Sequence, residues 1–168
     1  MTEGLPPGSD PRLTRLRDYL AAKEPHGQLP GRQHLDPLEI PDLLPYLRLV
    51  DVVPRDGGGF RYRIRLVGSE VASWFGVDGT GKFIDEVFTT AVSQRIIENY
   101  GMIVTTKRPQ YLQGLLSLKE REHVAIERAA FPLARDGTSV DMIVFIFARL
   151  PSGLTQPAAF MAERPTSP

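Results

Sequence analysis

The stretch that decides the fold is Phe60-Arg61-Tyr62-Arg63-Ile64-Arg65-Leu66-Val67, in which apolar and cationic side chains alternate. A period of two is typical of a strand with one face in a core. A second strand is predicted over residues 47–53, a short apolar run. The Gly-rich segment 54–59 between them is typical of a flexible turn. The two runs therefore predict an antiparallel hairpin.

Helical patterns lie on both sides of this hairpin. Residues 10–24 begin with Asp-Pro, a helix-start signal, and carry leucines at 13, 16 and 20 on one face. Residues 69–106 contain three helical segments, of which 90–106 is the longest. Three more strands are predicted at about 110–118, 123–131 and 140–149. The economical architecture is an α+β fold: a five-stranded antiparallel sheet, with the 69–106 helices across its inner face and the N-terminal helix outside.

Composition limits the class of protein. The 168 residues include 20 Lys+Arg and 20 Asp+Glu, which argues against a nucleic-acid binder with a strong positive field. There is no Cys, so thiolate chemistry and disulfides are excluded. No apolar run is long enough to span a membrane, and residues 1–9 lack signal-peptide features. We expect a cytoplasmic single domain over residues 10–150, with disordered segments at 1–9 and 151–168.

Motifs that resemble catalytic or metal sites are weak. Residues 76–82 have the spacing of a phosphate-binding loop, but Phe83 stands where Mg²⁺ coordination needs a hydroxyl, and the loop follows a helical pattern instead of a strand. The histidines at 26, 34 and 123 lack metal-ligand spacing. Asp85 and Glu86 are adjacent and would diverge on a helix. We expect no catalytic residues and no metal site.

The arginine row of the 60–67 strand has two interpretations. It is either a surface that binds phosphate or a partner, or a set of cross-strand ion pairs, which we favour. The acidic candidates for such pairs are Asp51, Glu127 and Asp141.

A series of short strings follows the chain in a fixed order. They are Gly27-Gln28-Leu29-Pro30-Gly31-Arg32, Asp36-Pro37, Ile40-Pro41, Leu43-Leu44-Pro45, Phe60-Arg61-Tyr62-Arg63, Leu66-Val67-Gly68-Ser69-Glu70, Gly76-Val77-Asp78-Gly79-Thr80-Gly81-Lys82, Glu127-Arg128, Pro132-Leu133, Asp136-Gly137 and Val140-Asp141-Met142. These strings resemble a bacterial subfamily of largely stand-alone PAS proteins, and the order of elements resembles that of PAS sensory domains. The resemblance runs from about Arg12 to Phe147, with Tyr19-Leu20 departing from a Tyr-Trp pair common in that subfamily.

This resemblance implies a sensing or interaction module without intrinsic catalysis, which passes its signal by contact with another signalling protein. Flavin-adduct photosensors of the family need a Cys, and its haem-binding domains usually offer a His from the long helix. This chain has no Cys, and residues 90–106 contain no His. Covalent flavin and haem are therefore not expected, while a noncovalently held metabolite stays open.

A candidate ligand site follows from the 123–131 strand. Arg128 shares a face with Val124, Ile126 and Ala130, so it would enter an otherwise apolar space. A buried guanidinium needs an anion, and its fork suits the carboxylate or phosphate of a small organic anion. The alternative is a bridge to Asp85, Glu86 or Asp141. The predicted ligand-binding residues are Tyr62, Trp74, Phe83, Tyr100, Tyr111, Arg128 and Val144.

Two other functions remain open: a small α+β enzyme with a buried carboxylate facing the cavity, and a protein that binds an anionic nucleotide through an unpaired arginine row. For the leucine stripe of residues 11–24 there are also two possibilities. It forms a homodimer interface, or it packs on its own sheet.

Overall fold

Five strands form one antiparallel sheet in the order β2-β1-β5-β4-β3. The computed structural model describes residues 5–25, 27–119 and 122–150. The strands are β1 (Leu47–Pro54), β2 (Phe60–Val67), β3 (Gln110–Lys119), β4 (Glu122–Leu133) and β5 (Met142–Arg149). The predicted fold class is confirmed, and the 60–67 strand has the predicted bounds.

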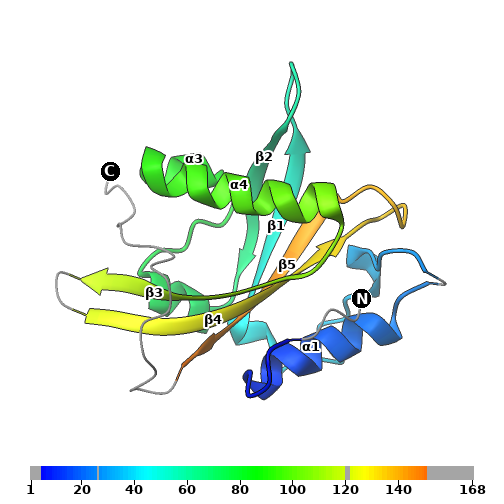
Figure 1. Cartoon of the computed structure of the whole chain (residues 1–168), viewed down its shortest axis with the longest axis horizontal. Coiled ribbons are helices and arrows are strands. Elements are labelled where there is room, and N and C mark those ends of the chain that lie inside the picture. Colours follow the sequence, from blue (N-terminus) through cyan, green and yellow to red (C-terminus); the bar gives the residue numbers. More distant parts are fainter. Residues whose placement is uncertain (1–4, 26, 120–121, 151–168) are drawn as a thin grey trace.

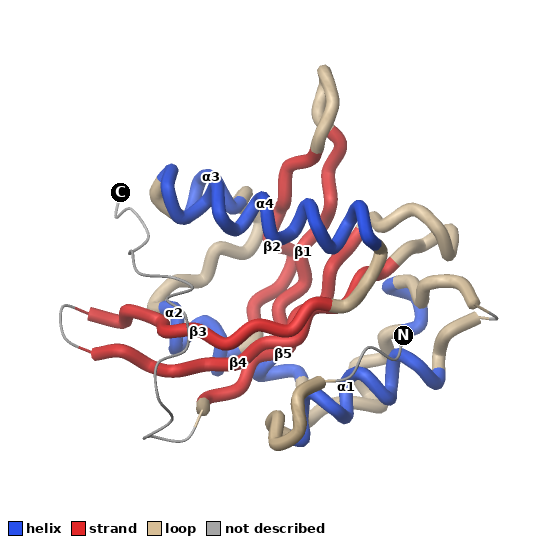
Figure 2. Tube along the Cα trace, in the orientation of Figure 1, coloured by secondary structure: helices blue, strands red, loops and turns tan. Residues whose placement is uncertain are grey.

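Three helices connect the edge strand β2 to the opposite edge strand β3. They are α2 (Ser69–Phe75), α3 (Ile84–Val87) and α4 (Thr90–Thr106). Figure 1 shows α4 crossing the sheet on one side, and Figure 2 shows the same separation of helix and strands. Lys107 caps the C-terminus of α4 with a left-handed backbone (φ 57°), two residues before Pro109. This long crossover places α4 over what we call the inner face of the sheet.

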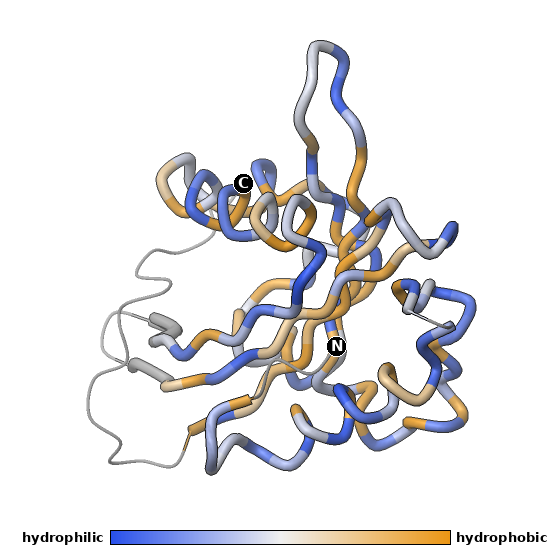
Figure 3. The backbone as a smooth tube through the Cα atoms, turned by 45° about the vertical axis from the view of Figure 1, so that its right-hand side comes forward, coloured by the Kyte–Doolittle hydropathy of each residue, from blue (hydrophilic) through white to orange (hydrophobic). Residues whose placement is uncertain are grey.

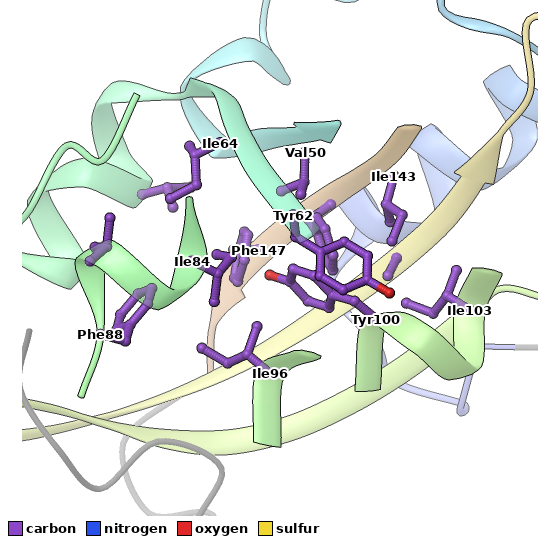
Figure 4. Packing of buried hydrophobic residues seen from close by; sticks show 14 of the residues in the cluster. Val50, Tyr62, Ile64, Ile84, Phe88, Ile96, Tyr100, Ile103, Ile143 and Phe147 are labelled. Atoms are coloured by element: carbon purple, nitrogen blue, oxygen red, sulfur yellow. The ribbon is translucent and has the colours of Figure 1, made fainter. Parts of the chain in front are cut away.

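The inner face and α4 enclose an aromatic-rich core. Its buried members from the sheet include Val50, Tyr62, Ile143, Phe145 and Phe147, and those from α4 include Ile96, Tyr100 and Ile103. Figure 4 shows Tyr62 and Tyr100 side by side in this core. In Figure 3 the hydrophobic segments concentrate in the strands at the centre of the molecule.

The outer face of the sheet is covered by α1 (Pro11–Ala22). Asp10 caps this helix by accepting a hydrogen bond from the Arg12 backbone N–H at 2.9 Å, as the Asp-Pro signal predicts. Leu13, Leu16 and Leu20 are fully buried against outer-face side chains such as Leu49, Phe131 and Ile146. The leucine stripe therefore packs on its own sheet, the second of the two possibilities, and homodimerisation through residues 11–24 stays a prediction.

The segment before α1 follows the outer face. Ser9 closes a turn by donating from its backbone N–H to the Pro6 carbonyl, and Leu5 packs against the outer core. The remaining residues for which disorder is expected, 1–4 and 151–168, lie outside the described part of the chain.

Candidate functional site

Strand β4 divides its side chains between the two faces as the alternation predicts. Ile126 and Ala130 belong to the inner core, whereas Ala129 and Phe131 belong to the outer core. Arg128 therefore points to the inner side and Glu127 to the outer side. Two neighbouring ionisable residues of one strand are thus separated by the sheet itself.

Arg128 is buried in the inner core, with 3% of its surface exposed. Its guanidinium carbon lies 5.1 Å from the centre of the Phe145 ring and 5.7 Å from that of Tyr100. Its Nη2 donates to the Gln110 side-chain oxygen at 3.4 Å. Burial lowers the pKa of Arg128 to about 10, opposed by Tyr100 and reinforced by the charge of Arg48. The side chain therefore remains cationic at neutral pH.

Arg48 is a second buried cation on the same face. Only 2% of it is exposed, and its guanidinium carbon lies 4.3 Å from the Phe75 ring centre and 5.4 Å from that of Phe147. Burial lowers its pKa, while Tyr100 and Asp78 raise it. Its Nε atom has no hydrogen-bond acceptor among the described residues. Sequence reasoning missed Arg48, although a charge inside an apolar run was the signal that marks it.

Aromatic rings from the sheet and α4 surround both guanidinium groups. The Tyr62 and Tyr100 rings meet edge to face at 5.2 Å, and Tyr100 lies 4.7 Å from Phe145. Phe145 and Phe147 are stacked at 6.2 Å. Burial, and then the neighbouring Tyr100, raise the pKa of Tyr62 to about 12. The predicted residues Tyr62, Tyr100 and Arg128 are thus brought together.

Trp74 and Phe83 lie away from this cluster. Trp74 is a buried member of the inner core, but its ring contacts Tyr46 at 5.9 Å and Arg149 at 5.2 Å. Phe83 is half-buried beside the edge strand, with the Arg61 guanidinium 3.7 Å from its ring centre. The ring contacts of Trp74 and Phe83 are therefore with Tyr46, Arg149 and Arg61, and not with Arg128.

The prediction that Tyr111 and Val144 share a space with Arg128 is wrong. Tyr111 packs against the outer core and pairs with the outer residue Ala129, and Val144 is itself an outer-core residue. Pairing across antiparallel strands keeps directly opposite residues on the same face. Both residues were selected by type, and their strand parity places them on the far side of the sheet.

Glu127 is a buried carboxylate of the outer face, with 2% of its surface exposed. One oxygen accepts from the Asp10 backbone N–H at 2.6 Å and the other from the Tyr111 hydroxyl at 2.6 Å. Burial and the hydrogen bond to Glu127 raise the pKa of Tyr111 to about 12. Glu127 therefore links the start of α1 to the sheet by a hydrogen bond. An enzyme with an isolated catalytic carboxylate would have that carboxylate facing the inner core, and Glu127 lies on the opposite face.

The arginine row is occupied by ion pairs, as favoured from the sequence. Arg63 and Arg65 both pair with Asp51, at 2.9 Å and 2.6 Å. Arg61 donates to Asp85 at 2.9 Å. Because these cations already have carboxylate partners, the row offers no unpaired face for a nucleotide.

The segment with the spacing of a phosphate-binding loop serves as a connection between two helices. Residues 76–82 connect α2 to α3, and Gly79 is buried against Ile64 and Val87, where a Cβ would collide with both. No cluster of His, Asp or Glu suited to a metal ion occurs among the described residues. Within the same part of the chain, no helix is long and apolar enough to cross a membrane.

Comparisons with solved structures find PAS and LOV domains at low identity. The PAS domain of BvgS from Bordetella pertussis is 14% identical, with a TM-score of 0.49, and the match covers 83% of this chain and 89% of that one. A variant of RsLOV is 13% identical, with a TM-score of 0.45, covering 84% and 72%. The PAS domain of an HTR-like protein from Haloarcula marismortui is 17% identical, with a TM-score of 0.37, covering 61% and 81%. Likeness at this level concerns the fold alone and says nothing of a ligand.

No curated protein matches the chain. A family model described as PAS domain matches residues 9–146, which span α1 and the whole sheet except the last three residues of β5. The sequence strings, the strand order and this match agree. The chain therefore belongs to the PAS domain family, whose members are sensory and signalling modules.

Proposed function

We propose that this PAS domain is a non-catalytic sensor that binds a small organic anion between its sheet and α4, and passes the signal by contact with a partner protein. The observation that carries the proposal is the burial of the cationic Arg128 among the aromatic rings of the inner core. A positive charge in such poorly hydrated surroundings attracts an anion strongly. The planar fork of a guanidinium also matches the geometry of a carboxylate.

Tyr100 connects this site to a helix that reaches the protein surface, so it could pass on a change at the site. It comes from α4, and its ring lies beside the Arg128 guanidinium. Met102, two residues further along α4, is 56% exposed. A ligand that displaces Tyr100 would shift α4 and the surface that carries Met102, and a partner protein that contacts this surface would detect the shift.

We also propose that the protein carries neither haem nor covalent flavin. The chain has no Cys for a flavin adduct, and α4, the helix from which haem-type members offer a ligand, contains no His. The purified protein should therefore be colourless in the visible range. A Soret band or flavin absorption at near-stoichiometric amount would contradict this.

Native mass spectrometry and thermal-shift measurements with small carboxylates test the binding proposal. We expect one or more anions to raise the melting temperature of the wild type, and Arg128→Gln to abolish the increase. Arg63→Gln is the matched control, because Arg63 lies on the surface and pairs with Asp51. Stabilisation that is equal in wild type and Arg128→Gln would contradict an anion site at this residue.

A further inference from the structure

A cavity lies where the segment before α1 meets the sheet. Its volume is about 620 Å³, which is usual for a small-molecule site. One wall is formed by residues 6–11, and the other by β3, β4 and the end of β5. Tyr111 and Glu127 belong to its lining and lie on the outer side. The cavity is therefore on the side of the sheet opposite to α4.

Glu127 brings a negative charge to the wall of this cavity. The two groups that donate to it, the Asp10 backbone N–H and the Tyr111 hydroxyl, belong to residues that also line the cavity. Both donors are uncharged, and among the described residues no Lys, Arg or His forms an ion pair with Glu127. Each carboxylate oxygen can accept a second hydrogen bond. The chain thus hydrogen-bonds this charge without neutralising it.

Gln113 adds an acceptor beside the carboxylate. It stands directly opposite Glu127 across β3 and β4, so the two side chains share a face. The Gln113 Nε2 donates to the Tyr111 hydroxyl at 2.6 Å, and its carbonyl oxygen accepts no hydrogen bond from the described chain. A primary ammonium has three N–H donors and no acceptor. This part of the wall therefore suits a primary ammonium.

Arg149 brings a positive charge to the same cavity. Its side chain is exposed, and its guanidinium carbon lies 5.2 Å from the Trp74 ring centre. Within the described part of the chain it forms no ion pair with a carboxylate. Its planar fork matches a carboxylate, whereas a ligand with a positive charge alone would be repelled. Because Glu127 and Arg149 have opposite signs, the cavity complements a molecule with both charges.

We infer that this cavity binds a free amino acid, with the ammonium at Glu127 and Gln113 and the carboxylate at Arg149. Amino acids carry both charges at neutral pH. The carbon chain lies on the apolar lining, which comes from the prolines of residues 6–11 and from Leu150. The inference goes beyond the proposed function, which concerns an anion on the other side of the sheet.

Isothermal titration calorimetry with glycine, β-alanine, 4-aminobutyrate and L-leucine tests this assignment. Butyrate and butylamine are the matched probes, since each keeps one of the two charges of 4-aminobutyrate. We expect the best amino acid to bind about tenfold or more tightly than either, which corresponds to about 1.4 kcal/mol. Butyrate that binds as tightly would overturn the role of the carboxylate in the wall, and butylamine that binds as tightly would overturn that of the guanidinium.

Variants locate the site. Arg149→Gln, at an exposed position, and Glu127→Gln, checked for folding by circular dichroism, should each weaken the best amino acid about tenfold. Arg15→Gln is the control, because Arg15 is an exposed arginine that pairs with Asp42. Unchanged affinity in Arg149→Gln overturns the site.

The same measurements separate this inference from the proposed function. Amino-acid affinity should be unchanged in Arg128→Gln, since Arg128 lies on the inner side. Amino-acid binding that is lost in Arg128→Gln but kept in Arg149→Gln overturns the outer site and leaves the proposed sensor intact. Absence of amino-acid binding to the wild type, with small carboxylates still bound, does the same.

Discussion

On the outer face of the sheet, the buried carboxylate of Glu127 accepts hydrogen bonds from Asp10 and Tyr111, whereas on the inner face the buried guanidinium of Arg48 rests on aromatic rings. Both side chains are 2% exposed. The outer charge therefore has partners supplied by the chain, and the inner charge has a nitrogen without an acceptor among the described residues.

The side chains around the two charges differ as well. The outer core is largely aliphatic and is covered by the leucines of α1, while the inner core gathers Tyr62, Tyr100, Phe145 and Phe147 around the arginines. Polar groups that are satisfied internally stabilise a packed layer, and those that are not satisfied favour an external partner. The outer face is therefore a packed layer whose buried carboxylate is hydrogen-bonded by the chain, and the inner face is where we propose that the sensed anion binds.

The largest effect is expected from Leu16→Ala on the outer face. Leu16 is fully buried, so its truncation leaves a cavity between α1 and the sheet. We expect a loss of about 2–5 kcal/mol in the free energy of unfolding, measured by urea denaturation, with anion affinity unchanged for the folded protein. Arg15→Ala, one residue earlier on the exposed side, is the control. A loss below about 0.5 kcal/mol would show that α1 is not required for stability.

Tyr111→Phe should have the next largest effect. It removes the hydroxyl that donates to Glu127 and leaves a buried carboxylate oxygen with one hydrogen bond fewer. We expect a loss of about 1.5–3 kcal/mol in urea denaturation at neutral pH, since hydrogen bonds to charged groups are in this range. Protection of the Asp10 amide against hydrogen exchange should fall as well. An unchanged free energy of unfolding would show that the hydrogen bond from Tyr111 to Glu127 does not stabilise the outer face.

Arg48→Leu should have a smaller effect, in the opposite direction. Replacing a buried charge by an apolar side chain of similar reach is often neutral or stabilising. We expect the free energy of unfolding to rise by about 1 kcal/mol in urea denaturation. A destabilisation of about 2 kcal/mol or more would mean that stacking on Phe75 and Phe147 fully satisfies the cation, and it would remove the contrast between the faces.

The smallest effect at neutral pH is expected from Tyr62→Phe, which is informative only in alkali. Burial raises the folded-state pKa of Tyr62 to about 12, above the value of about 10 for an unfolded chain. The folded protein therefore holds this proton more tightly, so its contribution is complete below about pH 10 and is lost as the pH rises through about 12. Tyr62→Phe should flatten the decline of stability across this range. A decline as steep as that of the wild type would contradict the raised pKa.

The parts of the molecule that could be predicted are those in which apolar and polar residues alternate strictly along a strand. The 60–67 strand and the inward direction of Arg128 follow from a period of two alone, without knowledge of neighbouring strands. Tyr111 and Val144 were misplaced because their face depends on register across β3, β4 and β5, which residue type does not determine. Arg48 was missed because reading residues 47–53 as one apolar run hides their parity. The partner of the leucine stripe was left open, since amphipathicity shows that a face is buried but not what buries it.

Trp74 has a practical consequence. It is the only Trp of the chain, and 4% of its surface is exposed. Its ring contacts Tyr46, which packs against both the inner and the outer core and carries the Arg12 guanidinium 4.1 Å from its own ring centre. The tryptophan fluorescence of the protein therefore originates from a single site where the two layers meet, so movement of either layer can be followed optically without attaching a dye.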